Sequence, residues 1–365
     1  MRLVVTGGGT GGHVYPALEV ALGGRAKGWE IRYLGSLRGQ EKAACEKVDV
    51  PFTGFPSEPV YRPLSVAGLK SLLRLARATA LAARDLSARR PDAVFATGGY
   101  SAAPVLQAAR RLKIPIVIHE QNAAPGRTTR IMGQSAAAVC TVFSAAAQHF
   151  PADRVHRTGM PIRRSLRESS QGTLLMEDET GKAAPMVLVM GGSQGSAALN
   201  DLALSTAVRM AATEIQWMHL TGLGHFESTH ASLKKMAVRA DYVIRAYLDA
   251  PEMAAALFNC SLALCRSGAG TMSELAAFRK PAILVPYPQA FANHQYLNAL
   301  EFQEMGAAEV VTQGEIQPAT LEARLHAWLN DTDRQAHARQ QLAAWDVPDA
   351  VDRILDIVKQ AGDRR

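Results

Sequence analysis

From its first residues, the chain alternates short apolar runs with longer stretches of helical periodicity. Apolar runs of this length, bounded by turn-forming residues, predict buried strands, and the periodic stretches between them predict helices. This alternation is typical of a mainly parallel sheet with helices on both faces. The predicted strands are Leu3–Thr6, Ile31–Leu34, Pro51–Phe55, Ala93–Thr97, Ile116–His119, Ala138–Val142, Met186–Met190, Ile215–His219, Tyr242–Arg245, Leu262–Cys265, Ala282–Val285 and Glu309–Val311. The predicted helices include Tyr15–Lys27, Leu69–Ser87 and Ser101–Leu112.

A strand that runs into a glycine-rich turn occurs twice, about half a chain apart. The first turn is Gly7–Gly12 and the second is Gly191–Gly195. With a length of 365 residues, this repetition predicts two similar α/β domains rather than one core. The boundaries that we predict are an N-terminal domain over 1–160, a polar linker over 161–185, a C-terminal domain over 186–340 and a helical tail over 341–365 that can pack back on the N-terminal domain.

Basic residues are concentrated in one segment of the chain. The net charge is +7 and the pI is about 9.3. Within residues 61–90 there are seven basic residues and a single acidic one, Asp85. Such an excess predicts an anionic partner, which can be a membrane surface, a nucleic acid or a phosphorylated ligand. The seven basic residues are Arg62, Lys70, Arg74, Arg77, Arg84, Arg89 and Arg90.

Leucines and basic residues form two neighbouring stripes on the helix predicted in this segment. This pattern indicates either a helix that lies at a membrane interface or an ordinary core-facing helix with a solvated charged face. Aromatic residues make up 6% of the chain and none interleaves the basic stripe, which argues against base stacking and nucleic-acid binding. The candidate membrane patch consists of Leu69, Lys70, Leu72, Leu73, Arg74 and Arg77.

Several other classes of protein are disfavoured by composition. No apolar run reaches the roughly 18 residues that span a bilayer, and the N-terminus has no separate export region, so we expect a cytoplasmic protein. No cluster of His, Cys and Asp has metal-ligand spacing. The cysteines show no paired spacing and predict buried free thiols. They are Cys45, Cys140, Cys260 and Cys265.

The first glycine turn allows two interpretations. Gly7, Gly9 and Gly12 fit the G-x-G-x-x-G spacing of a dinucleotide site. That site also needs a carboxylate at the end of the second strand, and this end has none, although Arg38 can suit the 2′-phosphate of NADP. Alternatively, the glycines let backbone N–H groups approach a sugar or phosphate at the start of a helix. His13 would then be a reactive group at that site.

Polar residues also follow other strands. Gly98–Ser101 and His119–Asn122 come directly after apolar runs, where they either cap turns or hydrogen-bond a polyhydroxyl ligand. The small residues of Ser267–Thr271 open a helix whose N-terminus favours a phosphate. Glu274, one turn further, can cap that helix or accept hydrogen bonds from a ribose diol. Phe291–Gln295 supplies further hydrogen-bonding groups after another strand.

Taken in order, these motifs resemble the MurG family, whose members transfer N-acetylglucosamine from UDP-N-acetylglucosamine to lipid I and make lipid II for peptidoglycan. The similarity spans roughly residues 3 to 310, and the ordered set is far more specific than any one motif. The motifs that carry it are Thr10–Leu18, Gly98–Tyr100, His119–Asn122, Gly191–Gly195, Arg266–Ala269 with Ser273-Glu274, and His294-Gln295.

The resemblance implies an α/β protein with the GT-B glycosyltransferase fold, in which two Rossmann-like parallel-sheet domains face a cleft. The donor is expected in the C-terminal domain and the acceptor against the N-terminal one. For the sugar and diphosphate, the implied contacts are Thr10, Gly11 and Gly12, and Asn122 and Gln295 are implied to contact the sugar. For the rest of the nucleotide, they are Arg163 and Ser193, Leu248 with uracil through its backbone, Ala269, Gly270 and Thr271 with the phosphates, and Glu274 with the ribose. The expected donor site is completed by Met272 and Ser273.

Two positions depart from the family pattern. The family commonly has asparagine where this chain has Met160, so a polar contact there is lost. Ser196-Ala197 also follow the second glycine turn, where the family has alanine and often arginine. These departures concern fine contacts with the donor and leave the implied reaction class unchanged.

The implied reaction is attack of a muramyl C4 hydroxyl on the donor's anomeric carbon with inversion. We expect His13 to be the general base, because an imidazole titrates near working pH. Glu120 is the second candidate, or it orients neighbouring groups. The helix N-terminus at Gly268–Thr271 would stabilise the leaving UDP, so no metal or other cofactor is expected. The expected partners are UDP-N-acetylglucosamine, lipid I, the anionic cytoplasmic surface of the bacterial inner membrane and other cell-wall synthesis proteins.

Overall fold

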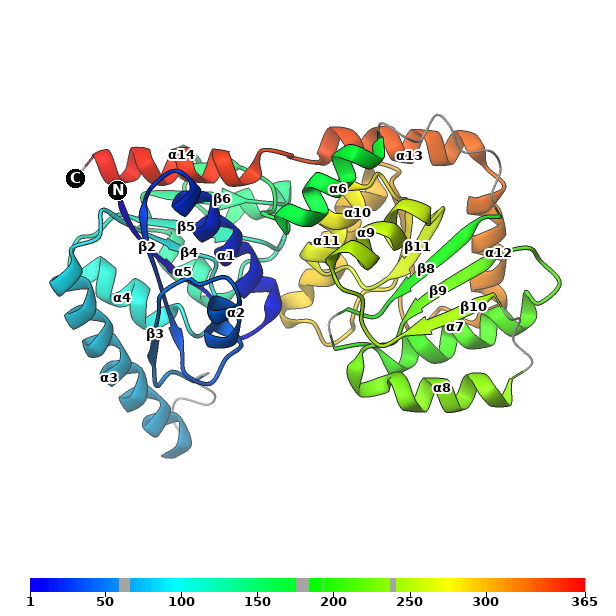
Figure 1. Cartoon of the computed structure of the whole chain (residues 1–365), viewed down its shortest axis with the longest axis horizontal. Coiled ribbons are helices and arrows are strands. Elements are labelled where there is room, and N and C mark those ends of the chain that lie inside the picture. The colour runs from blue at the N-terminus through cyan, green and yellow to red at the C-terminus, as the bar shows by residue number, and fades with distance from the viewer. Residues whose placement is uncertain (59–65, 175–183, 193, 237–240, 365) are drawn as a thin grey trace. The chain divides into compact units, whose positions relative to one another are not determined.

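The computed structural model describes residues 1–58, 66–174, 184–192, 194–236 and 241–364 (Figure 1). The chain folds into two compact units. Unit 1 contains Met1–Arg163 together with Val347–Arg365, and unit 2 contains Arg164–Asp346. The predicted boundaries were residues 160, 185 and 340, whereas the structure divides the chain at 163/164 and 346/347.

Unit 1 is built on a parallel sheet that has seven strands among the described residues, in the order β3-β2-β1-β4-β5-β6-β7. Every described pairing in it is parallel. The strands are β1 (Arg2–Thr6), β2 (Glu30–Ser36), β3 (Phe52–Phe55), β4 (Ala93–Ala96), β5 (Ile116–Glu120), β6 (Ala138–Thr141) and β7 (Val155–Arg157). The helices are α1 (Gly11–Ala26), α2 (Glu41–Lys47), α3 (Val66–Arg89), α4 (Ala103–Arg111), α5 (Arg127–Gly133), η1 (Ser144–His149), η2 (Ala152–Arg154) and α14 (Ala350–Asp363).

Unit 2 repeats this architecture with six parallel strands in its described part, in the order β10-β9-β8-β11-β12-β13. The strands are β8 (Met186–Met190), β9 (Gln216–Leu220), β10 (Tyr242–Arg245), β11 (Leu262–Cys265), β12 (Ala282–Leu284) and β13 (Ala308–Val310). The helices are α6 (Arg164–Leu174), α7 (Ala197–Arg209), η3 (Leu223–His225), α8 (Phe226–Lys235), α9 (Ala250–Asn259), α10 (Ala269–Ala277), η4 (Phe291–Asn293), α11 (His294–Glu304), α12 (Pro318–Leu329) and α13 (Thr332–Trp345).

The central strands of unit 1 are buried on both faces because helices cover both. Alternate residues of β1 show this, since Leu3 and Val5 belong to one core and Val4 to the other. The first core lies under α1 and α14, and the second under α3 and α4. A sheet covered on both sides needs nearly continuous apolar strands, which explains the runs seen in the sequence.

The last helix, α14, completes the first of these cores. Ile354, Leu355 and Val358 are fully buried there beside residues of α1. The approach is close: a Cβ on Gly23 of α1 would lie 2.5 Å from Val351. Figure 1 shows α14, in red, on the unit that also holds the N-terminus. The chain therefore returns to unit 1 after completing unit 2.

All twelve predicted strands are present. Three have the predicted ends, and the ends of the other nine are shifted by one or two residues. The additional strand, β7, contains one apolar residue in three and lies at the edge of the sheet, so it leaves no hydrophobic pattern to detect. The segment predicted as a linker contains α6, which packs against α9 and α10. Leu166 of α6 is fully buried, but most of its neighbours in the helix are polar, so the sequence showed no hydrophobic periodicity there.

All four cysteines are free and buried, as predicted. Burial raises the pKa of the Cys140 thiol to about 12, so it stays protonated. Within the described ranges, no helix has both the length and the hydropathy required to cross a membrane.

Candidate functional site

The glycine turn after β1 packs directly against the turn after β4. A Cβ on Gly7 would lie 1.8 Å from Thr97 Oγ1, and one on Gly99 would lie 2.0 Å from the carbonyl oxygen of Gly8. Gly9 and Gly99 also have φ values of +93° and +81°, which favour glycine. The glycines are therefore needed for close approach between two strand ends, which is where ligands bind in parallel sheets.

Helix α1 begins in this turn with an open N-terminus. Thr10 is its extended N-cap residue, and the Thr10 carbonyl accepts the N–H groups of His13 and Val14. Among the described residues, no side chain caps this end, and the first turn has no acidic residue. The exposed positions Thr10 and Gly12 therefore offer main-chain donors and a positive dipole end, as an anion or sugar site requires.

His13 lies at the start of a chain of hydrogen bonds that runs through the core of unit 1. Its Nδ1 is 2.7 Å from Gln121 Oε1. Gln121 Nε2 is 2.9 Å from His119 Nδ1 and also donates to the His119 carbonyl oxygen at 2.7 Å. His119 Nε2 in turn is 2.9 Å from the Gly159 carbonyl oxygen. Of the predicted polar residues at the end of β5, Gln121 thus contacts the ring of His13 directly, and His119 is connected to it through Gln121.

The two histidines in this chain have different environments. His13 is half-buried, with its ring against Gly98 and Gly99, whereas His119 is fully buried. Burial lowers the pKa of His119 to about 4, although its hydrogen bond to Gly159 acts in the opposite direction. His119 is therefore neutral near neutral pH, and His13 is the member that a ligand can reach.

Glu120 is a buried hydrogen-bond acceptor that organises the loop after β5. Its carboxylate accepts the N–H groups of Asn122 and Gly126 at 3.0 and 3.2 Å and the hydroxyl of Thr129. Burial raises the pKa of Glu120, and these hydrogen bonds, that of Thr129 first, act against the rise. With 2% of its surface exposed, Glu120 fits the predicted orienting role, which holds Asn122 in place, better than that of a base.

In unit 2, the N-terminus of α10 is open in the same way as that of α1. Gly268 is its extended N-cap residue, and added Cβ atoms on Gly268 or Gly270 would meet nothing within 4 Å. The first turn of α10 contains no acidic residue and the described structure provides no side-chain cap. As the first residues of the helix, Ala269, Gly270 and Thr271 have N–H groups without an acceptor inside the helix, which suits the phosphate contacts expected of them.

Met272 and Ser273 do not share this arrangement. Their side chains are buried, with 0% and 2% exposed, and the Ser273 hydroxyl donates to the carbonyl oxygen of Ala269. The N–H of Met272 is already bound to the Gly268 carbonyl. The helix therefore turns both side chains into the core, and their expected contact with the donor stays a prediction. Glu274, one turn further along the helix, is half-buried.

The other predicted donor residues are distributed along unit 2 and its boundary. Gln295 Oε1 accepts the N–H of Tyr287 at 2.9 Å, which fixes its amide. Leu248 is 4% exposed, so its side chain is buried, which agrees with a contact through its backbone; that contact stays a prediction. Arg163 is the last residue of the first stretch of unit 1. Ser193 lies outside the described residues.

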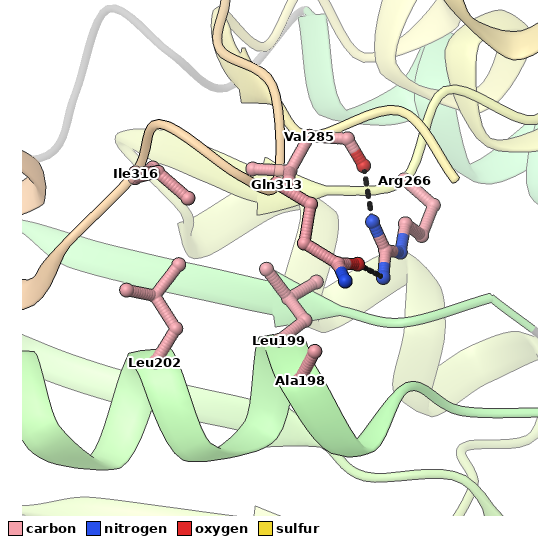
Figure 2. Close-up of a pocket in the computed structure, with 7 residues that line it drawn as sticks. All are labelled: Ala198, Leu199, Leu202, Arg266, Val285, Gln313 and Ile316. Atoms are coloured by element: carbon pink, nitrogen blue, oxygen red, sulfur yellow. Dashed lines mark hydrogen bonds between the residues drawn. The ribbon is translucent and has the colours of Figure 1, made fainter. Parts of the chain in front are cut away.

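Arg266 was not predicted as a site residue, yet it connects the loops at the strand ends of unit 2 (Figure 2). Its guanidinium donates to the carbonyl oxygens of Val285 and Pro286 at 2.9 and 3.1 Å, to Ser196 Oγ at 2.7 Å and to Gln313 Oε1 at 2.6 Å. It borders a cavity of about 170 Å³. The available signal was a charged residue directly after a buried strand.

The leucine stripe of helix α3 does not face the core of unit 1. Leu69 and Leu73 are 58% and 64% exposed, and Leu72, Lys70 and Arg77 are exposed as well. The core face of the helix consists instead of Ala78, Ala82 and Leu86. The leucines therefore do not face the core, and the alternative of an ordinary core-facing stripe is wrong. Arg62 lies outside the described residues.

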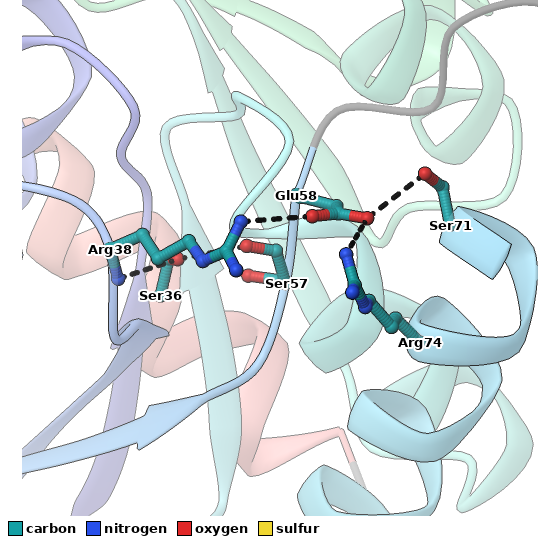
Figure 3. A network of polar contacts seen from close by, with 6 residues as sticks. All are labelled: Ser36, Arg38, Ser57, Glu58, Ser71 and Arg74. Carbon is teal, nitrogen blue, oxygen red and sulfur yellow. Dashed lines mark hydrogen bonds and ion pairs between the residues drawn. The ribbon is translucent and has the colours of Figure 1, made fainter. Parts of the chain in front are cut away.

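One acidic residue connects this helix to the loop after β2 (Figure 3). Glu58 accepts hydrogen bonds from Arg74 at 2.5 Å, Ser71 at 3.0 Å and Arg38 at 3.0 Å. The bonds from Arg74 and Ser71 lower the pKa of Glu58. Arg38 is thus paired with a carboxylate and is not held ready for the 2′-phosphate of NADP.

Comparison with known proteins extends over nearly the whole chain. The family models described as Glycosyltransferase family 28 N-terminal domain and C-terminal domain match residues 3–141 and 186–354. A protein of Desulforudis audaxviator is 36% identical over 99% of this chain and 98% of its own length, and one of Bacillus licheniformis is 32% identical over 99% and 98%. Both are named UDP-N-acetylglucosamine--N-acetylmuramyl-(pentapeptide) pyrophosphoryl-undecaprenol N-acetylglucosamine transferase.

A solved structure gives the same result. The crystal structure of Acinetobacter baumannii MurG is similar with a TM-score of 0.81 and 27% identity, and covers 98% of this chain and 99% of that one. The GT-B fold class implied by the motifs is confirmed. The chain therefore belongs to glycosyltransferase family 28 and, within it, to the MurG family of glycosyltransferases.

Proposed function

We propose that this protein transfers N-acetylglucosamine from UDP-N-acetylglucosamine to the C4 hydroxyl of the muramyl sugar of lipid I, with inversion, and releases lipid II and UDP. The observation that carries the proposal is the 32–36% identity, over almost the full length, to relatives named for this transfer. The open helix N-termini of α1 and α10 support it, because each is suited to the diphosphate or sugar of such substrates.

His13 is the general base of the proposed reaction. Its imidazole takes the proton of the acceptor hydroxyl while the hydroxyl oxygen bonds to the anomeric carbon. The bond between that carbon and the diphosphate oxygen breaks, and UDP leaves with the electron pair. The half-buried ring of His13 suits this role because a ligand can reach it, whereas Glu120 is enclosed by its own hydrogen-bond donors.

Main-chain groups stabilise the charge that develops on UDP. The N–H groups of Ala269, Gly270 and Thr271 point from the start of α10, where the helix dipole also favours negative charge. Glu274, at the rim of the same site, accepts hydrogen bonds from the ribose. We propose that with these donors the reaction requires no metal ion.

A transfer assay tests this function directly. Labelled N-acetylglucosamine should move from its UDP derivative to a lipid I analogue at the same rate with and without a chelator. If a chelator abolishes transfer and a divalent metal restores it, only the proposal that the reaction requires no metal is contradicted. Absence of transfer under every metal condition, with UDP still bound, would contradict the function.

We further propose that the protein works at the cytoplasmic face of the bacterial plasma membrane, where lipid I is anchored. The exposed leucines of α3 would enter the interface, and Lys70, Arg74 and Arg77 would lie near anionic headgroups. Arg74 differs from the other two because Glu58 pairs with it. Glu58 therefore reduces the positive potential of this patch.

Glu58→Gln should strengthen binding to vesicles of anionic lipid. Removing this carboxylate releases the charge of Arg74, and one basic residue near such a surface is worth about 1 kcal/mol, or roughly fivefold in affinity. Sedimentation with phosphatidylglycerol vesicles at low salt measures the change.

Asp85→Asn is the matched control. It frees Arg89 at the opposite end of the same helix and changes the net charge equally. An equal gain for both variants, or none for Glu58→Gln, would rule out the patch at Leu69–Arg77 as the membrane contact.

A further inference from the structure

The hydrogen bonds of Gln121 fix which nitrogen of His13 carries a proton. Carbonyl oxygens can only accept, and Gln121 Nε2 donates to the carbonyl oxygen of His119 at 2.7 Å. The orientation of the Gln121 amide is therefore determined by the main chain, and its Oε1 must face Nδ1 of His13 at 2.7 Å. Since that oxygen cannot donate, Nδ1 of His13 carries the hydrogen.

A second carbonyl fixes the other end of the chain independently. His119 Nε2 lies 2.9 Å from the carbonyl oxygen of Gly159, so this nitrogen carries the hydrogen of the neutral ring. His119 Nδ1 is then an acceptor and receives the second N–H of Gln121 at 2.9 Å. The carbonyl oxygens of His119 and Gly159 therefore require the same orientation of the Gln121 amide, with Nε2 toward His119 and Oε1 toward His13. Gln121 is 2% exposed.

We propose that Gln121 is a positioning residue that holds His13 with its proton on Nδ1 and its lone pair on Nε2, the nitrogen that accepts the proton of the acceptor hydroxyl. This inference rests on the proposed role of His13 as the base. An imidazole without such a partner exchanges its proton between both nitrogens, and only one tautomer has a basic Nε2. When Nε2 gains the hydroxyl proton, Nδ1 keeps its own and continues to donate to Gln121.

The neutral partner has a chemical consequence. An amide oxygen orients the ring without adding the full negative charge that a carboxylate would place beside it. The buried His119 ring adds no charge either, because burial holds its pKa at about 4. Neither Gln121 nor His119 therefore holds the proton gained by His13 in an ion pair.

Nuclear magnetic resonance of the full-length protein with ¹⁵N-labelled histidine tests the tautomer without any assay of activity. Two-bond ¹H–¹⁵N correlations distinguish a protonated nitrogen from a bare one, and the signals of His13 are those lost in His13→Gln. We expect a bare Nε2 in the wild-type protein. Gln121→Met, which keeps a side chain of similar size, should give averaged signals for both nitrogens.

His119→Asn tests whether the Gln121 amide orients His13 without the ring of His119. The main-chain carbonyl at position 119 survives this substitution and still orients Gln121, so the tautomer of His13 should persist. If wild-type His13 carries its hydrogen on Nε2, or if Gln121→Met leaves the tautomer unchanged, the proposal is overturned.

Kinetics provide the second readout. Gln121→Met should lower kcat by roughly ten- to hundredfold, as loss of an orienting partner does, while KM for UDP-N-acetylglucosamine stays within about twofold. Gln148→Met, an equal substitution at an exposed position, should change neither. A rise in KM with unchanged kcat would contradict the positioning role. Full activity of His13→Gln would instead contradict the proposed base and leave the spectroscopic result standing.

Discussion

His13→Gln should lower kcat for transfer to a lipid I analogue by about 10²- to 10⁴-fold, the usual contribution of a positioned general base. Glutamine keeps a polar side chain of similar length but cannot take a proton in this range of pH. Steady-state kinetics between pH 5.5 and pH 9 are the measurement.

Two comparisons make this result specific to His13. UDP affinity, measured by calorimetry, should remain within a few-fold of wild type, because the phosphate donors of α10 are intact. His156→Gln alters an exposed histidine of β7 and should leave kcat unchanged. If His13→Gln retains kcat within a few-fold of the wild-type value, another group accepts the proton and the assignment fails.

Gly99→Ala should destabilise the site in unit 1 by about 3 to 5 kcal/mol, since it combines backbone strain with overpacking. The new Cβ would lie 2.0 Å from the carbonyl oxygen of Gly8, and main chain cannot move aside as a flexible side chain can. The φ of +81° adds strain of its own. Because the ring of His13 lies against the same turn, transfer activity should fall together with stability.

Hydrogen exchange measures this loss locally, in peptides that cover β1 and β4, against peptides of unit 2. Gly28→Ala is the matched control, because Gly28 has a similar φ of +77° and nothing lies within 4 Å of its added Cβ. Gly28→Ala should lower the free energy of unfolding by only about 1 to 2 kcal/mol, because the alanine must adopt a left-handed backbone conformation. Equal effects of the two substitutions would show that the contact between the glycine turns is not tight.

The sheet could be predicted from sequence because a strand covered on both faces must be apolar throughout. The strand β1 shows this, since its residues divide between two cores. The glycine turns and His13 were also predictable, because strand ends in parallel sheets carry the site. The short edge strand β7 could not be found, since an edge position requires no apolar run.

The contacts that organise the site could not be predicted from the sequence for a different reason. His13 and Gln121 are 108 positions apart, and only the order of β1, β4 and β5 in the sheet brings them together. Arg266 likewise contacts Ser196, 70 positions away. The direction in which the leucines of α3 face was also undetermined, because a helical stripe has the same spacing whether it meets a core or a membrane.

The return of the chain to unit 1 has a consequence for synthesis on the ribosome. The core beneath α1 includes Ile354, Leu355 and Val358, which emerge only after all of unit 2 has been made. Until then the nascent unit 1 exposes the apolar surface that α14 will cover. Unit 2 is continuous in sequence and can fold first, so the domain that begins the chain is the one completed last.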